Sequence, residues 1–247
     1  MADLPQHLII ATSPVAAAAN QVVGDHYRIT VLTSRLLRLE YSPTGRFEDR
    51  ATQLALHRDL GPVDFRVVRD AAGLHLFTDA LVLDYDEGPF SSSGLTVRLS
   101  GGPGYHSEWR YGVRFQPDKW QPGNLGGTAR TLDGVDGSRS LEDGLVSTTG
   151  YAILEDTGLA LGEDGWVSSR IEGNTDLYYF GYGWDAADAV RDFYRLAGPQ
   201  PLLPRWALGN WWSRYHAYTA DEYTELVERF EAERLPFSVA VVDMDWH

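Results

Sequence analysis

Hydrophobic and polar residues alternate along much of the first half of the chain. In the stretch "HYRITVLTSRLLRLEYS", apolar or aromatic side chains recur at every second position, with polar partners between them. These positions are Tyr27, Ile29, Val31, Leu37, Leu39 and Tyr41. A period of two places such side chains on one face of a strand. The stretches "FRVVRDAAGLHLFTDALVLDYDEG" and "SSGLTVRLSGG" continue as short strands with glycine-containing turns. From Asp25 to about Arg114, closely spaced strands without helices predict an antiparallel β-sandwich.

The pattern changes between Gln116 and Gly150, where glycines are frequent and apolar periodicity is nearly absent. A stretch this long without regular structure is typical of a functional loop or of a disordered insert. Scattered apolar residues favour a packed, shaped loop. They are Leu125, Leu132, Val135, Leu141, Leu145 and Val146.

Strands resume in "YAILEDTGLALGEDGWVSSR" and "DLYYFGYG", and a helix follows. Asp185 is its expected N-cap, and Gly198-Pro199 is expected to end it. The apolar stripe of this helix is predicted from the i, i+3, i+4 spacing. It consists of Ala189, Val190, Phe193 and Tyr194.

The last part of the chain predicts a strand, a helix and a second strand. The run "RWALGNWWSRY" is apolar and aromatic, as for a strand buried on both faces. Thr219 and Glu222 have the spacing of a capping box. Tyr223, Leu226, Val227 and Phe230 give the stripe of an amphipathic helix. Pro236 is expected to end that helix, and Val239 to Asp243 to form the next buried strand. We therefore predict a right-handed βαβ unit with parallel strands.

Composition limits the classes of partner. The net charge of -14 argues against nucleic acid or an anionic membrane, since both attract basic surfaces. No Lys or Arg precedes Arg28, and no apolar run has the length of a membrane span, so we expect no signal peptide and a cytoplasmic protein. The chain has no cysteine, and its seven histidines do not cluster at ligand spacing. We therefore expect neither a metal site nor an organic cofactor.

The stretch "VAVVDMDWH" places Asp243 and Asp245 at the carboxyl end of a predicted strand, where α/β folds bind ligands. The two carboxylates could bind a hard cation. They could also serve phosphoryl transfer, although no glycine-rich phosphate loop follows. A third possibility is a sugar site, with aromatic residues nearby as stacking surfaces. The acids could instead cap the N-terminus of a following helix.

Longer strings of residues resemble a known family. The run "PLLPRWALGNWWSRYHAYTADEYTELVERFEAERLPFSVAVVDMDWH" resembles the start of the catalytic barrel in glycoside hydrolase family 31, the α-glucosidases and α-xylosidases. The segments "NLGGTARTLDGVDG", "LEDGLVS" and "DLYYFGYGWDAADAVRDFYRLAG" resemble the N-terminal sandwich of that family and its link to the barrel. The resemblance implies a mainly β chain in which a galactose-mutarotase-like antiparallel β-sandwich precedes an incomplete (β/α)8 barrel. The expected divisions are a sandwich over 1–184 with a loop at 116–150, a connection over 185–204, and one βαβ unit over 205–247.

The resemblance also implies roles for individual residues. Asp243 matches the aspartate that hydrogen-bonds sugar hydroxyls in the −1 subsite, with Met244 beside it as an apolar wall. Tyr215 matches a tyrosine that ends the first barrel strand and lines the same pocket. Asp245 and Trp246 belong to the same signature. Asp136, in the glycine-rich loop, is a further candidate contact to substrate.

Both catalytic aspartates of the family lie on later barrel strands than the two found here, so we expect no catalytic residue in this chain. We expect a truncated barrel that is inactive alone, and an α-linked oligosaccharide or glycoside as the ligand of the complete enzyme. Two alternatives remain, a stand-alone carbohydrate-binding module and a protein-interaction module. Because two barrel strands would expose unpaired edges and apolar side chains, self-association through the barrel start is a further expectation.

Overall fold

A computed structural model describes residues 9–101, 107–113, 123–127, 134–139, 141–162, 164–200 and 202–243. The chain divides into two compact units, Met1–Pro199 and Gln200–His247. Each unit is treated by itself below. Over the described residues, the longest helices are too short and too polar to cross a membrane.

The first unit contains two antiparallel sheets of five strands each. The first sheet has the strand order β1-β2-β3-β12-β9. Its strands are β1 (Gln21–Val23), β2 (Tyr27–Thr33), β3 (Leu36–Tyr41), β12 (Thr175–Gly181) and β9 (Tyr151–Glu155). The second sheet runs in sequence order from β4 to β8. Its strands are β4 (Arg66–Asp70), β5 (Gly73–Phe77), β6 (Leu81–Tyr85), β7 (Leu95–Leu99) and β8 (Glu108–Arg110).

The main hydrophobic core lies between these sheets. The alternating residues Tyr27, Ile29, Val31, Leu37 and Leu39 are all buried in it, as the period of two predicts. The second sheet supplies the facing side chains, also at every second position. They include Leu74, Leu76, Leu81, Leu83, Leu95 and Val97. The predicted antiparallel sandwich is therefore confirmed.

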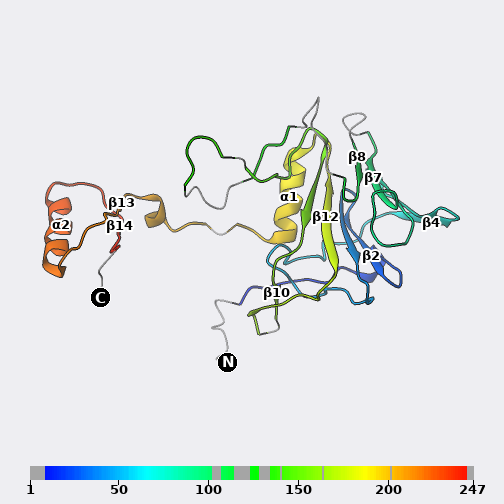
Figure 1. The fold of residues 1–247 in the computed structure, drawn as a ribbon, viewed down its shortest axis with the longest axis horizontal. Helices are drawn as coiled ribbons and strands as arrows, with labels where there is room; N and C mark the ends of the chain where they lie inside the picture. Colours follow the sequence, from blue (N-terminus) through cyan, green and yellow to red (C-terminus); the bar gives the residue numbers. More distant parts are fainter. Residues whose placement is uncertain are drawn as a thin grey trace. The chain divides into compact units, whose positions relative to one another are not determined.

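The first sheet is also covered on its other face. A second cluster contains Leu32, Leu36 and Phe180 from the sheet, with Ala189 and Leu196 from α1 (Ala186–Ala197). Helix α1 runs beside β12 (Figure 1). The central strands β2, β3 and β12 are thus buried on both faces, whereas β5 and β6 alternate between buried and partly exposed residues.

The structure corrects two details of α1. Ala189, Phe193 and Leu196 face the sheet, whereas the predicted stripe members Val190 and Tyr194 are 38% and 40% exposed. Leu196 continues the i, i+4, i+7 spacing from Ala189, and this row rather than the neighbouring one meets the sheet. Asp185 stands at the N-cap, but its side chain makes no capping bond and pairs with Arg35 instead.

Gly198 ends α1 as expected. It has a φ of 82°, a conformation that glycine adopts without steric cost. The remaining short elements of this unit are the 3-10 turn η2 (Ala18–Asn20) and the hairpin of β10 (Ala160–Leu161) with β11 (Val167–Ser168).

The second unit contains the 3-10 turn η3 (Arg205–Leu208), β13 (Trp211–Trp212), α2 (Ala220–Ala232) and β14 (Val239–Ala240). Strands β13 and β14 pair in parallel. The predicted order of strand, helix and parallel strand is confirmed. The chain is therefore mainly β, with an antiparallel sandwich followed by one βαβ unit.

Candidate functional site

The parallel pair in the second unit defines where its strands end. Trp211 pairs with Val239 and Trp212 with Ala240, and the Val241 N–H donates to the carbonyl of Trp212 at 3.0 Å. Both strands run toward the same edge, so the residues that follow them leave the sheet on the same side. This edge is where α/β folds collect ligand-binding side chains.

Helix α2 is fastened to this pair by its N-terminus and by aromatic contacts. The hydroxyl of Thr219 accepts from the N–H of Glu222, and the Glu222 carboxylate accepts from the N–H of Thr219, so the predicted capping box is confirmed. The hydroxyl of Tyr223 donates to the carbonyl of Val241 at 2.9 Å. The rings of Phe230 and Trp212 meet edge to face at 5.2 Å. These contacts place the predicted apolar stripe of the helix against the strands.

The strands themselves are shorter and more exposed than predicted. Only two residues of the run "RWALGNWWSRY" form a strand, and its first part is the turn η3. Trp206 is 55% and Trp211 51% exposed, so a strand buried on both faces is wrong for this structure. The reason is that, within the described residues, β13 has β14 as its only strand partner. A ladder of two strands supports fewer hydrogen bonds and covers less side chain than a sheet.

Two of the predicted site residues follow the strands of this pair. Tyr215 lies three residues beyond Trp212, and Asp243 lies three residues beyond Ala240. Both are exposed, Tyr215 to 76%, and neither side chain bonds to another described residue. Met244, Asp245 and Trp246 lie outside the described residues. Tyr215 and Asp243 therefore each follow a strand of the parallel pair at the same distance along the chain.

Asp136 belongs to the first unit and is exposed there. The glycine-rich loop around it is paired at its base. The N–H of Leu125 donates to Val146 at 2.9 Å, and the side-chain oxygen of Asn124 accepts from Gly126 and Gly144. A Cβ on Gly144 would lie 3.1 Å from the carbonyl oxygen of Gly126, a tight contact, so glycine eases the close approach of the two segments. The described parts of the loop are therefore shaped by their own hydrogen bonds.

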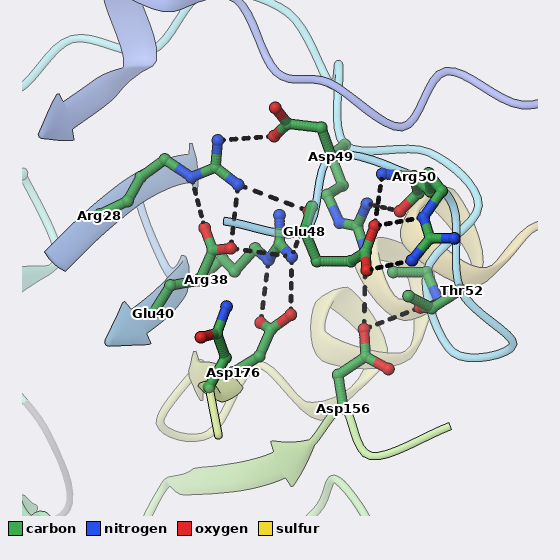
Figure 2. A network of polar contacts seen from close by, with 12 residues as sticks. Arg28, Arg38, Glu40, Glu48, Asp49, Arg50, Thr52, Asp156 and Asp176 are labelled. Atoms are coloured by element: carbon green, nitrogen blue, oxygen red, sulfur yellow. Dashed lines mark hydrogen bonds and ion pairs between the residues drawn. The ribbon is translucent and has the colours of Figure 1, made fainter. Parts of the chain in front are cut away.

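Sequence reasoning missed a buried network of charged residues on the outer face of the first sheet (Figure 2). Arg38 donates to both carboxylate oxygens of Asp176, at 2.9 and 2.6 Å. Arg28 does the same to Glu40, at 2.6 and 2.9 Å. All four residues are at most 7% exposed. Such two-point contacts are the strongest geometry available to arginine and a carboxylate.

The network continues into the loop after β3 and to Asp156, the residue that follows β9. Asp156 lies 2.7 Å from Arg170 and 3.5 Å from Arg58, and it accepts from Thr52 at 2.7 Å. Arg58 also donates to the hydroxyl of Tyr178 at 2.7 Å. The charged groups face one another and are enclosed by protein. The network therefore stabilises the fold and offers no group to a ligand. Its signal in the sequence was the charged residues inside strands β2 and β3.

The second unit is similar in sequence to known proteins. Residues 200–247 match the family model described as the glycosyl hydrolases family 31 TIM-barrel domain. An alpha-xylosidase of Saccharolobus solfataricus is 34% identical over 104 residues, which are 40% of this chain and 14% of that protein. The second unit is thus similar in sequence to the barrel domain of family 31. A second sequence relative, alpha-glucosidase 2 of Bacillus thermoamyloliquefaciens, is 33% identical over 75 residues, 30% of this chain and 10% of that protein.

Solved family 31 structures share the fold. A dextranase of Flavobacterium johnsoniae, complexed with glucose, superimposes with a TM-score of 0.56 over 93% of this chain and 32% of that one, at 14% identity. An alpha-xylosidase from a soil metagenome, complexed with xylose, gives a TM-score of 0.52 over 92% of this chain and 40% of that one, at 14% identity. The chain thus spans well under half the length of the relatives that it matches. The resemblance to family 31 that its motifs show is confirmed.

Proposed function

We propose that this chain is the N-terminal portion of a retaining α-glycoside hydrolase that acts on α-linked glucosides or xylosides. The observation that carries the proposal is the parallel pair β13–β14, whose strands are followed by Tyr215 and Asp243. This pair lies in a segment that matches the family 31 barrel. The two sequence relatives, one called an alpha-xylosidase and the other an alpha-glucosidase, support both sugar classes.

In this proposal Asp243 accepts hydrogen bonds from hydroxyls of the terminal sugar, and Tyr215 forms a wall of the same pocket. Met244 supplies apolar contact, while Asp245 and Trp246 contact the sugar or support Asp243. Asp136, in the glycine-rich loop, is proposed as a further contact to substrate. The exposure of Tyr215 and Asp243, together with their lack of bonds to other described residues, supports these roles, since ligand-binding groups must be open to solvent before binding.

We propose that the catalytic acids lie outside residues 1–247. Retaining hydrolysis needs a nucleophilic carboxylate and an acid/base carboxylate about 5 Å apart. A complete (β/α)8 barrel needs about 250 residues, far more than follow the sandwich here. One βαβ unit supplies the sugar-binding side of the site without either catalytic group. The chain alone is therefore proposed to be inactive.

Enzyme assays on two proteins test this function. The 247-residue chain and the full open reading frame that contains it are assayed with aryl α-glucoside and aryl α-xyloside. We expect turnover from the longer protein and none from the shorter. Turnover by the shorter chain that survives repurification and disappears in its Asp243→Asn variant would overturn the claim of inactivity. A longer protein that hydrolyses neither substrate, despite being folded, would overturn the proposed activity and favour a stand-alone binding or protein-interaction module.

A further inference from the structure

A cleft of about 750 Å³ opens at one end of the sandwich, entirely within the first unit. Its walls come from the turn between β2 and β3, the start of β4 and the end of β5. The hydroxyl of Thr78 donates to the carbonyl of Ser34 at 2.6 Å and accepts from the N–H of Leu81, so the two sheets are joined at this cleft. The volume is in the range of sites that bind small molecules.

Aromatic rings form one wall of the cleft. Phe65 and Phe77 are partly buried, and the guanidinium of Arg66 lies 4.2 Å from the centre of the Phe77 ring. The face of an aromatic ring carries partial negative charge and attracts positively polarised groups. Arg66 occupies one face of the Phe77 ring in this way, so this wall of the cleft is an arginine stacked on an aromatic ring.

The charged side chains that line the cleft cancel. Asp64 and Asp79 oppose Arg66 and Arg195. Arg195 is held by Asp192 at 2.8 Å and by the carbonyl of Leu60 at 2.8 Å. The carboxylates of Asp64 and Asp79 accept no hydrogen bond from the described residues and form no ion pair with them, so they are open acceptors. A strongly anionic or cationic ligand would meet like charges here. An uncharged ligand rich in hydroxyl groups can bond to both kinds of group.

A second, smaller cleft of about 230 Å³ adjoins the first, because Asp79 lines both. Trp184 lines this cleft and is 73% exposed. Arg35 and Asp185, which form an ion pair at 2.6 Å, line it as well. A large aromatic residue so exposed next to a polar cleft is a common feature of binding surfaces. The joined clefts thus offer the exposed aromatic surface of Trp184 and, where they meet, the carboxylate of Asp79.

We propose that these joined clefts bind an uncharged oligosaccharide on the sandwich, through residues of the first unit. A sugar ring stacks through its C–H bonds on Trp184, and the hydroxyls of the oligosaccharide donate to Asp64 and Asp79. The choice of ligand rests in part on the proposed carbohydrate function. The site retains or orients a substrate chain and carries out no chemical step.

Calorimetric titration of the 247-residue chain with isomaltotriose and with maltotriose tests the proposal. We expect saturable binding of at least one trisaccharide. Asp79→Ala and Trp184→Ala should each weaken it about tenfold or more, since each removes one side of the contact. Trp166→Ala is the matched control, because Trp166 is also an exposed tryptophan of this unit but lines neither cleft. It should leave the affinity unchanged, and circular dichroism checks that each variant is folded.

The variant Asp243→Ala separates this inference from the proposed function. Binding that survives Asp243→Ala but weakens in Asp79→Ala supports the cleft, whatever the enzyme assays give. Binding that is lost in Asp243→Ala and retained in Asp79→Ala and Trp184→Ala overturns the cleft, while it supports the proposed barrel site. Absence of binding of either trisaccharide to the folded chain also overturns the cleft, and it leaves the activity of the longer protein to its own test.

Discussion

Asp176 on β12 lies directly opposite Glu40 on β3, and the guanidinium of Arg38 lies between the two carboxylates. Its Nη2 is 2.6 Å from Asp176 and 3.0 Å from Glu40, and all three side chains are at most 3% exposed. Like charges directly opposite each other across two strands are destabilising. Arg38 is thus the group that allows these acids to share one buried face.

Removing Arg38 should therefore destabilise the sandwich strongly. We expect Arg38→Ala to lower the free energy of unfolding by about 3–5 kcal/mol, because it leaves buried carboxylates without their partner. Urea denaturation measures the change. Arg98→Ala is the control, since Arg98 pairs with Asp84 in a half-exposed position where such pairs contribute less than about 1 kcal/mol. Equal losses in the two variants would contradict the role given to Arg38.

Acid should weaken the fold through Asp176. Burial opposes ionisation of this carboxyl, but the charges of Arg38 and Arg170 outweigh burial and hold its pKa below the usual range. A folded pKa below the unfolded value of about 3.9 means that the stabilisation is present above that pH and is lost as pH falls through the folded pKa. The urea midpoint of the wild type should therefore fall steeply below about pH 4.

The variant Asp176→Asn should lose this part of the pH dependence. It is expected to be less stable than the wild type at neutral pH, because Arg38 and Arg170 lose a charged partner. The difference between the two proteins should shrink as pH falls. A difference that stays constant down to the acid transition would show that Asp176 does not titrate in the way described.

Replacing Asp243 in the full open reading frame should impair catalysis and leave the fold intact. We expect Asp243→Ala to reduce kcat/KM by about tenfold to a hundredfold, since a charge-assisted hydrogen bond contributes about 1.5–3 kcal/mol. Glu228→Ala, on the exposed face of α2, is the matched control and should retain normal kinetics. A near-normal kcat/KM for Asp243→Ala would mean that the residue lies outside the pocket.

Deleting residues 205–247 should leave a folded, monomeric sandwich. Both hydrophobic clusters lie within the first unit, whereas the second unit exposes large apolar side chains. These include Trp206, Leu208, Trp211 and Val242. Exposed apolar surface promotes association, so light scattering should show self-association of the 247-residue chain and not of the shortened one. A 247-residue chain that stays monomeric at high concentration, with its tail protected from protease, would contradict this prediction.

Much of the local structure could be predicted from neighbours along the chain. The alternation from Tyr27 to Leu39 identified the side chains of the main core, because strand geometry puts every second residue on one face. Thr219 and Glu222 predicted the start of α2, because a capping box is formed within four consecutive residues. The longer strings that resemble family 31 indicated the order of sandwich and barrel. The roles of Asp243, Tyr215 and the other proposed site residues remain predictions.

Only the tertiary structure decided what lies against each element. The row of α1 that meets the sheet contains Leu196 rather than Tyr194, and both rows satisfy a helical period. Arg38 lies between apolar residues of a strand, a position that does not indicate which residue it pairs with. Its partner Asp176 comes from β12, 138 positions away. Periodicity records how side chains are distributed around one element. The partner of a buried charge, the neighbours of a strand and the surface that covers one face of a helix all come from distant segments. Those segments are brought together only when the chain folds.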